Sequence, residues 1–325
     1  MRTVVGVLRG GPSSEYAISL QSGAHILAAI DQKMYEPRDI FISREGGWHV
    51  RGLEVPPERA LHGVDVAFNV LHGEYGESGD VQKILEAAGT PYTGSDAFSS
   101  AIAFNKQTTK DIVSREGIKV ARGVVIEQPT DIEKVALNLF RTFPHPAMVK
   151  PVVGGSSVGM TMADSYHSLH DGLIRAFEVS PMALVEEYIK GKEATVGVIE
   201  HFRNEPLYAL MPVEIIPPPR HRFFSYEAKY SGESTERVPG NFTDAEKKQL
   251  TDAAKKVHAL MGARHYSRSD FIVSKRGVYF LEINSAAAVG MTQESLFPKA
   301  LEAVGSKMSD FIHHSIQLAL EPRKR

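Results

Sequence analysis

Cysteine is absent from this chain of 325 residues, and the absence excludes several kinds of protein. Without thiols the chain can form neither disulfides nor zinc sites with thiolate ligands, which suits a cytoplasmic location. A large net charge is also missing: the value is −2, so we expect no general attraction to nucleic acid or to an anionic membrane surface. No hydrophobic run approaches the length of a transmembrane helix, and neither a P-loop nor a dinucleotide-binding glycine fingerprint occurs.

The rest of the composition describes an ordinary globular protein with room for more than one domain. Hydrophobic residues make up 42% of the chain and charged residues 23%. A chain of this length is long enough for two or three domains with a large buried core. Residues 3–8 are apolar but too few for the core of a signal peptide, so they predict a first β-strand.

The first part of the chain, residues 1–95, alternates between strand and helix patterns. This alternation is typical of a parallel α/β sheet, on which ligands bind beyond the carboxyl ends of the strands. The segments 10–13 and 72–76 both contain glycine and lie at such ends, so we expect this domain to bind a substrate there. The expected strands cover residues 3–8, 39–43 and 64–71, and the expected helices cover residues 14–30 and 79–88.

Two further domains are expected, at residues 96–182 and 183–325. Residues 217–240 are rich in Pro, Gly, Ser and charge and have no periodicity, which indicates a functional loop or lid inside the last domain. A single helix is expected over residues 96–116, with Lys106 near its middle. Further helices are expected at residues 165–177, 243–261 and 307–320, and strands at residues 147–150, 158–160, 183–187 and 194–199.

Polar side chains on two late strands predict a metal site. Asp270 lies in one apolar strand, and Glu282 and Asn284 end the next strand. Mg²⁺ prefers hard oxygen ligands and is often held between carboxylates and substrate phosphates. The alternative is that these side chains only end two strands at the protein surface.

A lysine followed by a glycine-rich turn predicts a phosphate-binding loop. Lys150 ends an expected strand, and Gly154, Gly155, Ser156 and Ser157 follow it. Glycines let backbone N–H groups approach phosphate oxygens, and the lysine adds a positive charge. The alternative is a β-hairpin with a flexible tip.

Acidic residues further along the chain are candidates for binding adenosine. A carboxylate at Glu186 could accept a hydrogen bond from the adenine amino group, and Glu193 could bind the ribose hydroxyls. An acidic strand end in solvent is the alternative.

Two further motifs could bind or cover a substrate. Glu15 could bind a substrate ammonium, or it could only favour the start of a helix. Lys229 and Tyr230 lie in the long loop and could close the site, or could be ordinary surface residues.

Together these motifs, in this order and spacing over nearly the whole chain, resemble the D-alanine–D-alanine ligases of the ATP-grasp superfamily. The resemblance implies an α/β ATP-grasp fold in which the N-terminal domain is followed by central and C-terminal α+β domains that sandwich ATP. The matching segments are residues 10–23, 71–79, 91–95, 150–159, 227–230, 268–284 and 290–296.

The resemblance also implies a role for each site residue. Lys106 and Lys150 would contact ATP phosphates, Glu186 and the Ile189 backbone the adenine, and Glu193 the ribose. Asp270, Glu282 and Asn284 would hold two Mg²⁺ ions, for which Mn²⁺ could substitute. Glu15 would bind the ammonium of the first D-alanine, linked to Ser156 and Tyr230, and Lys229 and Ser295 would bind the carboxylate of the second. Arg268 and the Gly290 N–H would stabilise the oxyanion.

The implied reaction joins two D-alanine molecules through an acyl phosphate, for the synthesis of peptidoglycan precursors in the cytoplasm. The implied assembly is a homodimer. Two alternatives stay open: a related ligase that takes D-lactate or D-serine second, and a nucleotide-binding pseudoenzyme on the same fold. Tyr230 favours the dipeptide, because members of the family that make the depsipeptide tend to have histidine at this position.

One departure from the family's pattern concerns the second substrate. The segment 285–289 is two residues longer than usual and lacks the usual proline before Gly290. The two extra residues could bulge outward, for which the alanines are small enough, or they could displace the Gly290 N–H. The loss of proline should make the segment more mobile. We therefore expect a working enzyme with a weaker second subsite.

Overall fold

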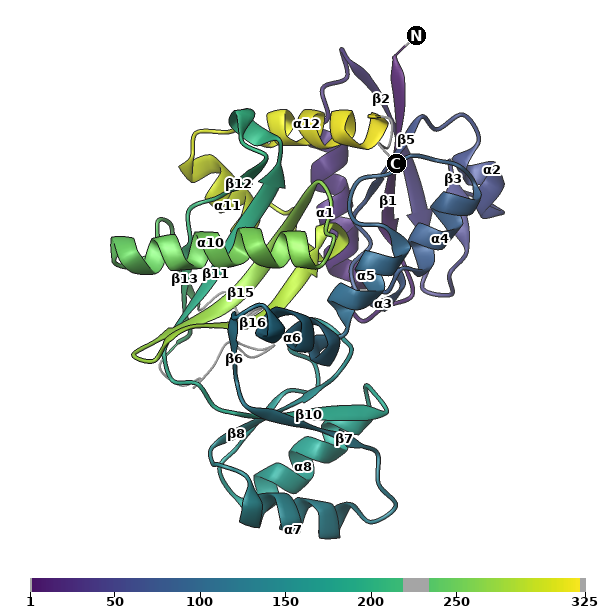
Figure 1. Ribbon diagram of the computed structural model, residues 1–325. Helices are drawn as coiled ribbons and strands as arrows, with labels where there is room; N and C mark the ends of the chain where they lie inside the picture. The colour runs from purple at the N-terminus through teal and green to yellow at the C-terminus, as the bar shows by residue number, and fades with distance from the viewer. Residues whose placement is uncertain (1, 219–233, 322–325) are drawn as a thin grey trace.

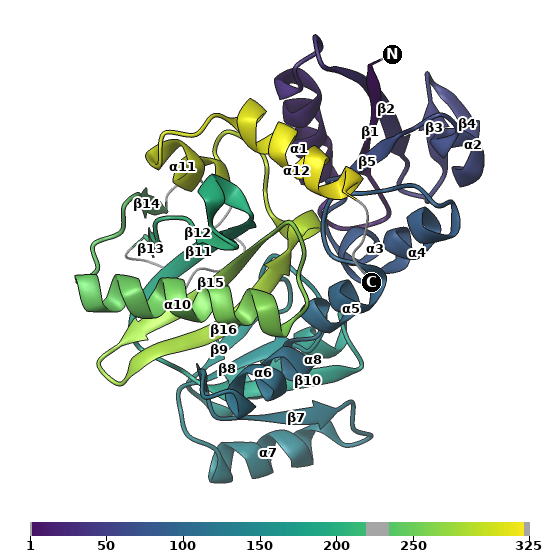
Figure 2. The ribbon, with the colours of Figure 1, turned by 45° about the horizontal axis from the view of Figure 1, so that its top comes forward.

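The computed structural model describes residues 2–218 and 234–321 and arranges them around three sheets (Figure 1). The N-terminal sheet lies at the upper right, a four-stranded sheet at the bottom, and a seven-stranded sheet between them. Figure 2 shows the same three sheets from a second direction.

The N-terminal sheet has the strand order β4-β3-β2-β1-β5. Its centre is parallel, as expected, because β1 pairs in parallel with both β2 and β5. Gly10 ends β1 with φ of +95°, and a Cβ there would lie 2.2 Å from the Ile42 carbonyl oxygen, so only glycine fits this turn. The elements are β1 (Thr3–Gly10), α1 (Tyr16–Ala29), β2 (Tyr35–Ile42), β3 (Trp48–Val50), β4 (Leu53–Val55), α2 (Pro57–Leu61), β5 (Val66–Asn69), α3 (Glu74–Glu77) and α4 (Asp80–Ala87).

Two helices, rather than the one expected over residues 96–116, connect this sheet to the others. They are α5 (Ala97–Phe104) and α6 (Lys106–Arg115). Asn105 breaks the pattern because its backbone leaves the helical region and its side chain accepts a hydrogen bond from the Thr108 N–H at 2.9 Å. Lys106 therefore begins a helix instead of lying in the middle of one.

The four-stranded sheet is antiparallel, in the order β7-β10-β8-β9. Helices α7 and α8 pack on it through Leu139, Leu169 and Leu173. The strand expected at residues 158–160 is wrong: Ser156 and Ser157 have positive φ, so the chain turns and the strand begins at Thr161. The elements are β7 (Gly123–Glu127), α7 (Ile132–Thr142), β8 (Ala147–Pro151), β9 (Thr161–Ala163), α8 (Tyr166–Phe177) and β10 (Met182–Glu187).

The seven-stranded sheet has the order β14-β13-β11-β15-β16-β6, with β12 paired to β11. Helix α10 covers one face, where Phe271 and Phe280 pack with Leu250. The elements are β6 (Lys119–Val120), β11 (Lys192–Glu200), η1 (Phe202–Asn204), β12 (Leu207–Ala209), β13 (Val213–Ile216), β14 (Thr235–Arg237), α10 (Asp244–Leu260), β15 (Tyr266–Ser274), β16 (Gly277–Ser285), η2 (Ala286–Ala288), α11 (Leu296–Ala303) and α12 (Met308–Leu320).

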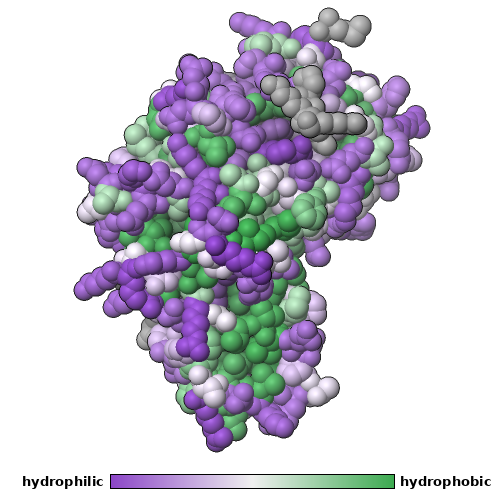
Figure 3. Space-filling view, viewed as in Figure 1, coloured by the Kyte–Doolittle hydropathy of each residue, from purple (hydrophilic) through white to green (hydrophobic). Residues whose placement is uncertain are grey.

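Most of the face shown in Figure 3 is polar, with a hydrophobic area on the lower lobe. Exposed apolar side chains of the four-stranded region include Val124, Leu137 and Ile174. Within residues 2–218 and 234–321, no helix combines the length and the apolar character needed to cross a membrane.

Candidate active site

A cleft between the four-stranded and seven-stranded sheets is lined by six of the candidate residues. Its volume is about 880 Å³ including space open to solvent, which is the size range of small-molecule sites. Apolar side chains of Met148, Ile189 and Ile272 form one part of the lining. The charged lining residues are Lys150, Glu193, Arg268, Asp270 and Glu282.

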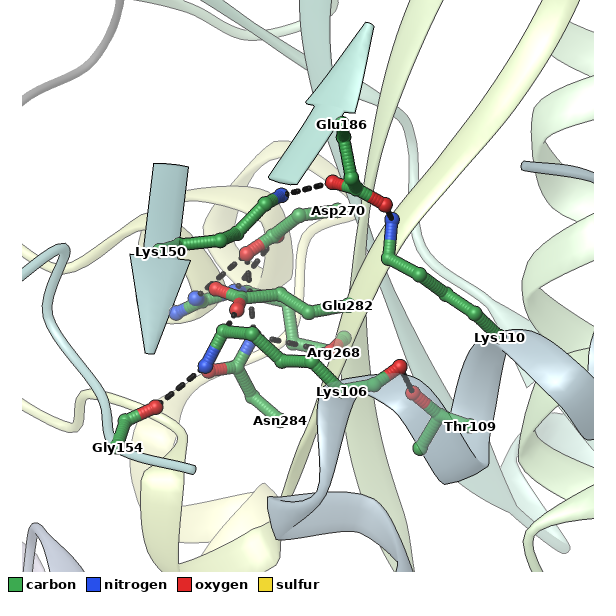
Figure 4. Close-up of polar contacts among 10 residues, drawn as sticks. All are labelled: Lys106, Thr109, Lys110, Lys150, Gly154, Glu186, Arg268, Asp270, Glu282 and Asn284. Atoms are coloured by element: carbon green, nitrogen blue, oxygen red, sulfur yellow. Dashed lines mark hydrogen bonds and ion pairs between the residues drawn. The ribbon is translucent and has the colours of Figure 1, made fainter. Parts of the chain in front are cut away.

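The seven-stranded wall of this cleft brings the predicted metal ligands together (Figure 4). Asp270 on β15 lies opposite Glu282 on β16, and Arg268 lies opposite Asn284. The ladder is irregular after Asp270, so Leu281 has no partner of its own and both it and Glu282 line the cleft. This irregularity turns Glu282 and Asn284 to the same face as Asp270.

Asp270 is the centre of the polar contacts on this wall. Arg268 donates two hydrogen bonds to its carboxylate, both 3.1 Å long, and Asn284 donates a third at 3.0 Å. The Thr195 hydroxyl donates another at 2.5 Å. Such a carboxylate is held in one orientation, as a ligand for a cation must be.

The donor atoms on this wall suit a hard divalent cation. Asp270 and Glu282 offer carboxylate oxygens and Asn284 an amide oxygen, a set that fits Mg²⁺ or Mn²⁺ and not a soft metal. Across the described parts of the chain, no three His, Asp or Glu side chains converge as a metal site, so the amide is needed as the third ligand.

The glycine-rich turn lies directly across from this wall. Lys106 donates a hydrogen bond to the Gly154 carbonyl oxygen at 2.5 Å, and its Nζ lies 3.5 Å from a Glu282 oxygen. Lys150 lies next to the last residue of β8 and lines the cleft. Glu282 therefore lines both the cleft that contains Lys150 and a smaller adjoining pocket that contains Lys106 and Gly154.

The same turn reaches the N-terminal domain through Ser156. The Ser156 hydroxyl donates a hydrogen bond to the Glu15 carboxylate, and both residues are buried. Glu15 is the N-cap residue of α1, but its side chain makes no capping hydrogen bond there. A role in starting the helix therefore does not explain where this carboxylate points.

Glu186 does not lie at an exposed strand end. Its side chain is 2% exposed, and it lies between Lys110 and Lys150, with each Nζ 2.5 Å from one carboxylate oxygen. Burial acts to raise the pKa of Glu186, but the two lysines outweigh it and hold the pKa below its usual value. Ile189 and Glu193, by contrast, line the cleft directly.

The residues expected at the second subsite lie next to the turn η2. The Ser295 hydroxyl accepts a hydrogen bond from the Thr292 N–H at 3.2 Å and lies near Gly290. The outward bulge expected for residues 285–289 is wrong, because Ala286 and Val289 are buried in the main apolar core. The extra length therefore folds inward. Lys229 and Tyr230 lie outside the described residues.

Three polar residues near the site were missed in the sequence. Lys110 follows Lys106 by four residues on α6, a spacing that puts both on one helix face and could have been noticed. Thr195 contacts Asp270 from the neighbouring strand β11. Glu77 lines a smaller pocket with Lys106, and it accepts a hydrogen bond from the Gly73 N–H at 2.7 Å.

Comparison with known sequences places these features in one family. The family model described as "D-ala D-ala ligase C-terminus" matches residues 112–317, and the one described as "D-ala D-ala ligase N-terminus" matches residues 4–60 and 51–95. A D-alanine–D-alanine ligase from Syntrophobacter fumaroxidans is 34% identical over 323 residues, 98% of each chain. One from Geobacter sulfurreducens is 34% identical over 95% of this chain and 92% of its own.

Solved structures show the same fold. A D-Ala:D-Ser ligase from Enterococcus faecalis superposes with a TM-score of 0.85 at 28% identity, covering 98% of this chain and 100% of its own. A D-alanyl-alanine synthetase A from Vibrio cholerae gives 0.82 at 29% identity, covering 98% of each. The expected α/β ATP-grasp fold is confirmed, and the chain belongs to the D-alanine–D-alanine ligase family.

Proposed function

We propose that this chain joins two D-alanine molecules at the expense of ATP, as the names of its relatives say of those proteins. One observation carries the proposal. The turn at Gly154–Ser156 contacts Lys106, which pairs with Glu282 of the cleft, on one side and the Glu15 carboxylate of the N-terminal domain on the other. In this proposal the phosphate site and the ammonium site would meet at a single turn.

In the proposed reaction the carboxylate of the first D-alanine attacks the γ-phosphorus of ATP. An O–P bond forms, the bond to ADP breaks, and an acyl phosphate results. Glu15 would hold the ammonium of this D-alanine, while Lys106 and Lys150 would offset the phosphate charge. Ile189 and Glu193 would contact the adenosine.

The amine of the second D-alanine then attacks the acyl carbon, the C–O bond to phosphate breaks, and the amine loses a proton. Arg268 and the Gly290 N–H would stabilise the tetrahedral oxyanion. Ser295 and Lys229 would bind the second carboxylate, and Tyr230 would help the loop of residues 217–240 to exclude water.

The family uses ATP with a divalent cation. We propose Mg²⁺, two ions, with Mn²⁺ as a substitute, held by Asp270, Glu282 and Asn284. When bound, such ions would neutralise phosphate charge beside the reacting oxygens. A cytoplasmic homodimer that supplies peptidoglycan precursors completes the proposal.

Product analysis tests this function. The protein is incubated with ATP, Mg²⁺ and D-alanine, alone and mixed with D-lactate or D-serine, and the products are separated by mass. We expect D-alanyl-D-alanine and one ADP per dipeptide, with no product from L-alanine. A mixed product in excess would identify the second substrate as D-lactate or D-serine, and ATP binding without turnover would identify a pseudoenzyme.

A further inference from the structure

Helix α6 carries a second buried lysine that the proposed reaction does not use. The Lys110 side chain is 5% exposed, and its Nζ lies 2.5 Å from one oxygen of Glu186. The other Glu186 oxygen lies 2.5 Å from the Nζ of Lys150, which lines the cleft. Figure 4 shows the carboxylate between the two ammonium groups.

This arrangement has one more positive charge than it needs. A single lysine would neutralise Glu186, and a second buried ammonium adds a desolvation penalty that packing alone does not require. The penalty is visible in Lys110, because burial lowers its pKa from 10.5 to about 8 despite the opposing attraction of Glu186. An apolar residue of the same length could fill this space without that cost.

The two lysines lie on opposite sides of Glu186. Lys110 lies behind Glu186, on the side of α6, whereas Lys150 lies in front of it, on the side of the cleft. A carboxylate shared between two ammonium groups binds each of them less strongly than it would bind one alone. Removing Lys110 would give Lys150 the whole of the Glu186 charge.

We propose that Lys110 is a positioning residue for nucleotide binding. By sharing Glu186, it limits the hold of that carboxylate on Lys150 and keeps the Lys150 ammonium available to the polyphosphate of ATP. This inference rests on the proposed function, in which Lys150 contacts phosphate. The competing explanation is a purely structural one, in which Lys110 only joins α6 to β10.

The first test compares Lys110→Met with Lys256→Met. Lys256 also tethers α6, since it donates to the Glu116 carbonyl oxygen at 2.6 Å, but it is exposed and remote from Glu186. The dissociation constant of ADP with Mg²⁺ is measured by calorimetry, and the KM values for ATP and D-alanine by ADP release. We expect Lys110→Met to raise the ADP constant and the KM for ATP about tenfold, the usual weight of one charged contact.

Two further results separate positioning from a structural role. The KM for D-alanine should change less than about twofold in Lys110→Met, and Lys256→Met should leave all three constants unchanged. An ADP constant unchanged in Lys110→Met, with only a lower melting temperature, would overturn the proposal. So would an equal rise of the KM for D-alanine.

A conservative variant keeps the test valid if Lys110→Met does not fold. Lys110→Arg retains a positive charge beside Glu186, so the proposal expects an ADP constant within about threefold of the wild type. A folded Lys110→Arg whose ADP constant rises about tenfold or more would overturn the proposal. Because ADP binding needs no D-alanine, these results are independent of whether the wild type makes dipeptide.

Discussion

The two walls of the cleft both carry paired charges, but their carboxylates differ in how far they are buried. On the seven-stranded wall, the side chains of Asp270 and Glu282 are 18% and 36% exposed. On the four-stranded wall, Glu186 is 2% exposed, and its partners Lys110 and Lys150 are 5% and 7% exposed.

The difference indicates which wall can exchange partners with a ligand. The Glu282 carboxylate keeps contact with water, so it can turn from Lys106 to a metal ion at a smaller cost than a fully buried carboxylate could. A buried pair cannot be broken so cheaply, because the remaining charge would lack both water and a partner. We therefore expect the seven-stranded wall to carry the chemistry and the four-stranded wall to fix the lysines.

The largest effect on stability is expected on the four-stranded wall. Glu186→Gln would leave Lys110 and Lys150 as neighbouring buried cations, which should lower the free energy of unfolding by about 3–5 kcal/mol. Chemical denaturation would measure this. Glu282→Gln is the matched control, since its exposed side chain should cost less than about 1 kcal/mol. Equal losses in the two variants would contradict the distinction between the walls.

For turnover, the larger effect is expected on the seven-stranded wall. Glu282→Gln removes a charged oxygen from the proposed metal site, so we expect kcat to fall about a hundredfold or more. The rate of ADP release at increasing Mg²⁺ concentration would show it, with a weaker apparent affinity for the ion. If Glu282→Gln turned over at the wild-type rate, Glu282 could not be a metal ligand.

A smaller effect is expected where the glycine-rich turn meets the N-terminal domain. A Cβ at Gly155 would lie 2.9 Å from a Glu15 oxygen, so Gly155→Ala should push this carboxylate aside. Losing one charged hydrogen bond to the substrate ammonium should raise the KM for D-alanine about tenfold. ADP affinity serves as the internal control and should not change. A rise in the ADP constant of the same size would mean that the whole turn had moved.

Much of the fold could be predicted from the sequence, because long apolar runs and amphipathic helices are local signals. The break at Asn105 could have been predicted too, since an asparagine followed by polar residues is a common helix start. The short antiparallel additions β3 and β4 could not, because three-residue strands have too few residues to show a period.

The site divides in the same way. Alternation along a strand predicts which residues share a face with Asp270 or with Glu282. The irregular pairing at Leu281, which turns Glu282 and Asn284 to the cleft, depends on the partner strand and could not be predicted. The pairing of Lys110 with Glu186 needs the Lys110 side chain of α6 to reach β10, which no local pattern contains. The expected boundary between residues 182 and 183 likewise stays a proposal, and it cuts β10, whose Met182 pairs with β7.

The smallest effect is expected behind the seven-stranded wall, at a buried histidine. His265 accepts a hydrogen bond from the Gly94 N–H at 2.9 Å on its Nδ1, and this bond requires the neutral ring. Burial, together with the nearby charge of Arg264, lowers the pKa of His265 to about 4, although Glu200 acts in the opposite direction. Between that value and about 6.5 the unfolded chain takes up a proton and the folded chain does not, so stability falls as the pH falls.

We expect the titration of His265 to lower the free energy of unfolding by roughly 1 kcal/mol when the pH falls from 7 to 5.5. Denaturation curves of the wild type and of His265→Asn at both pH values would measure it, because asparagine tolerates the φ of +64° at this position without titrating. The variant should be less stable at pH 7 but should lose less on acidification. Identical pH dependence in the two proteins would assign the acid sensitivity to groups other than His265, and the junction at Gly94 would then be insensitive to pH.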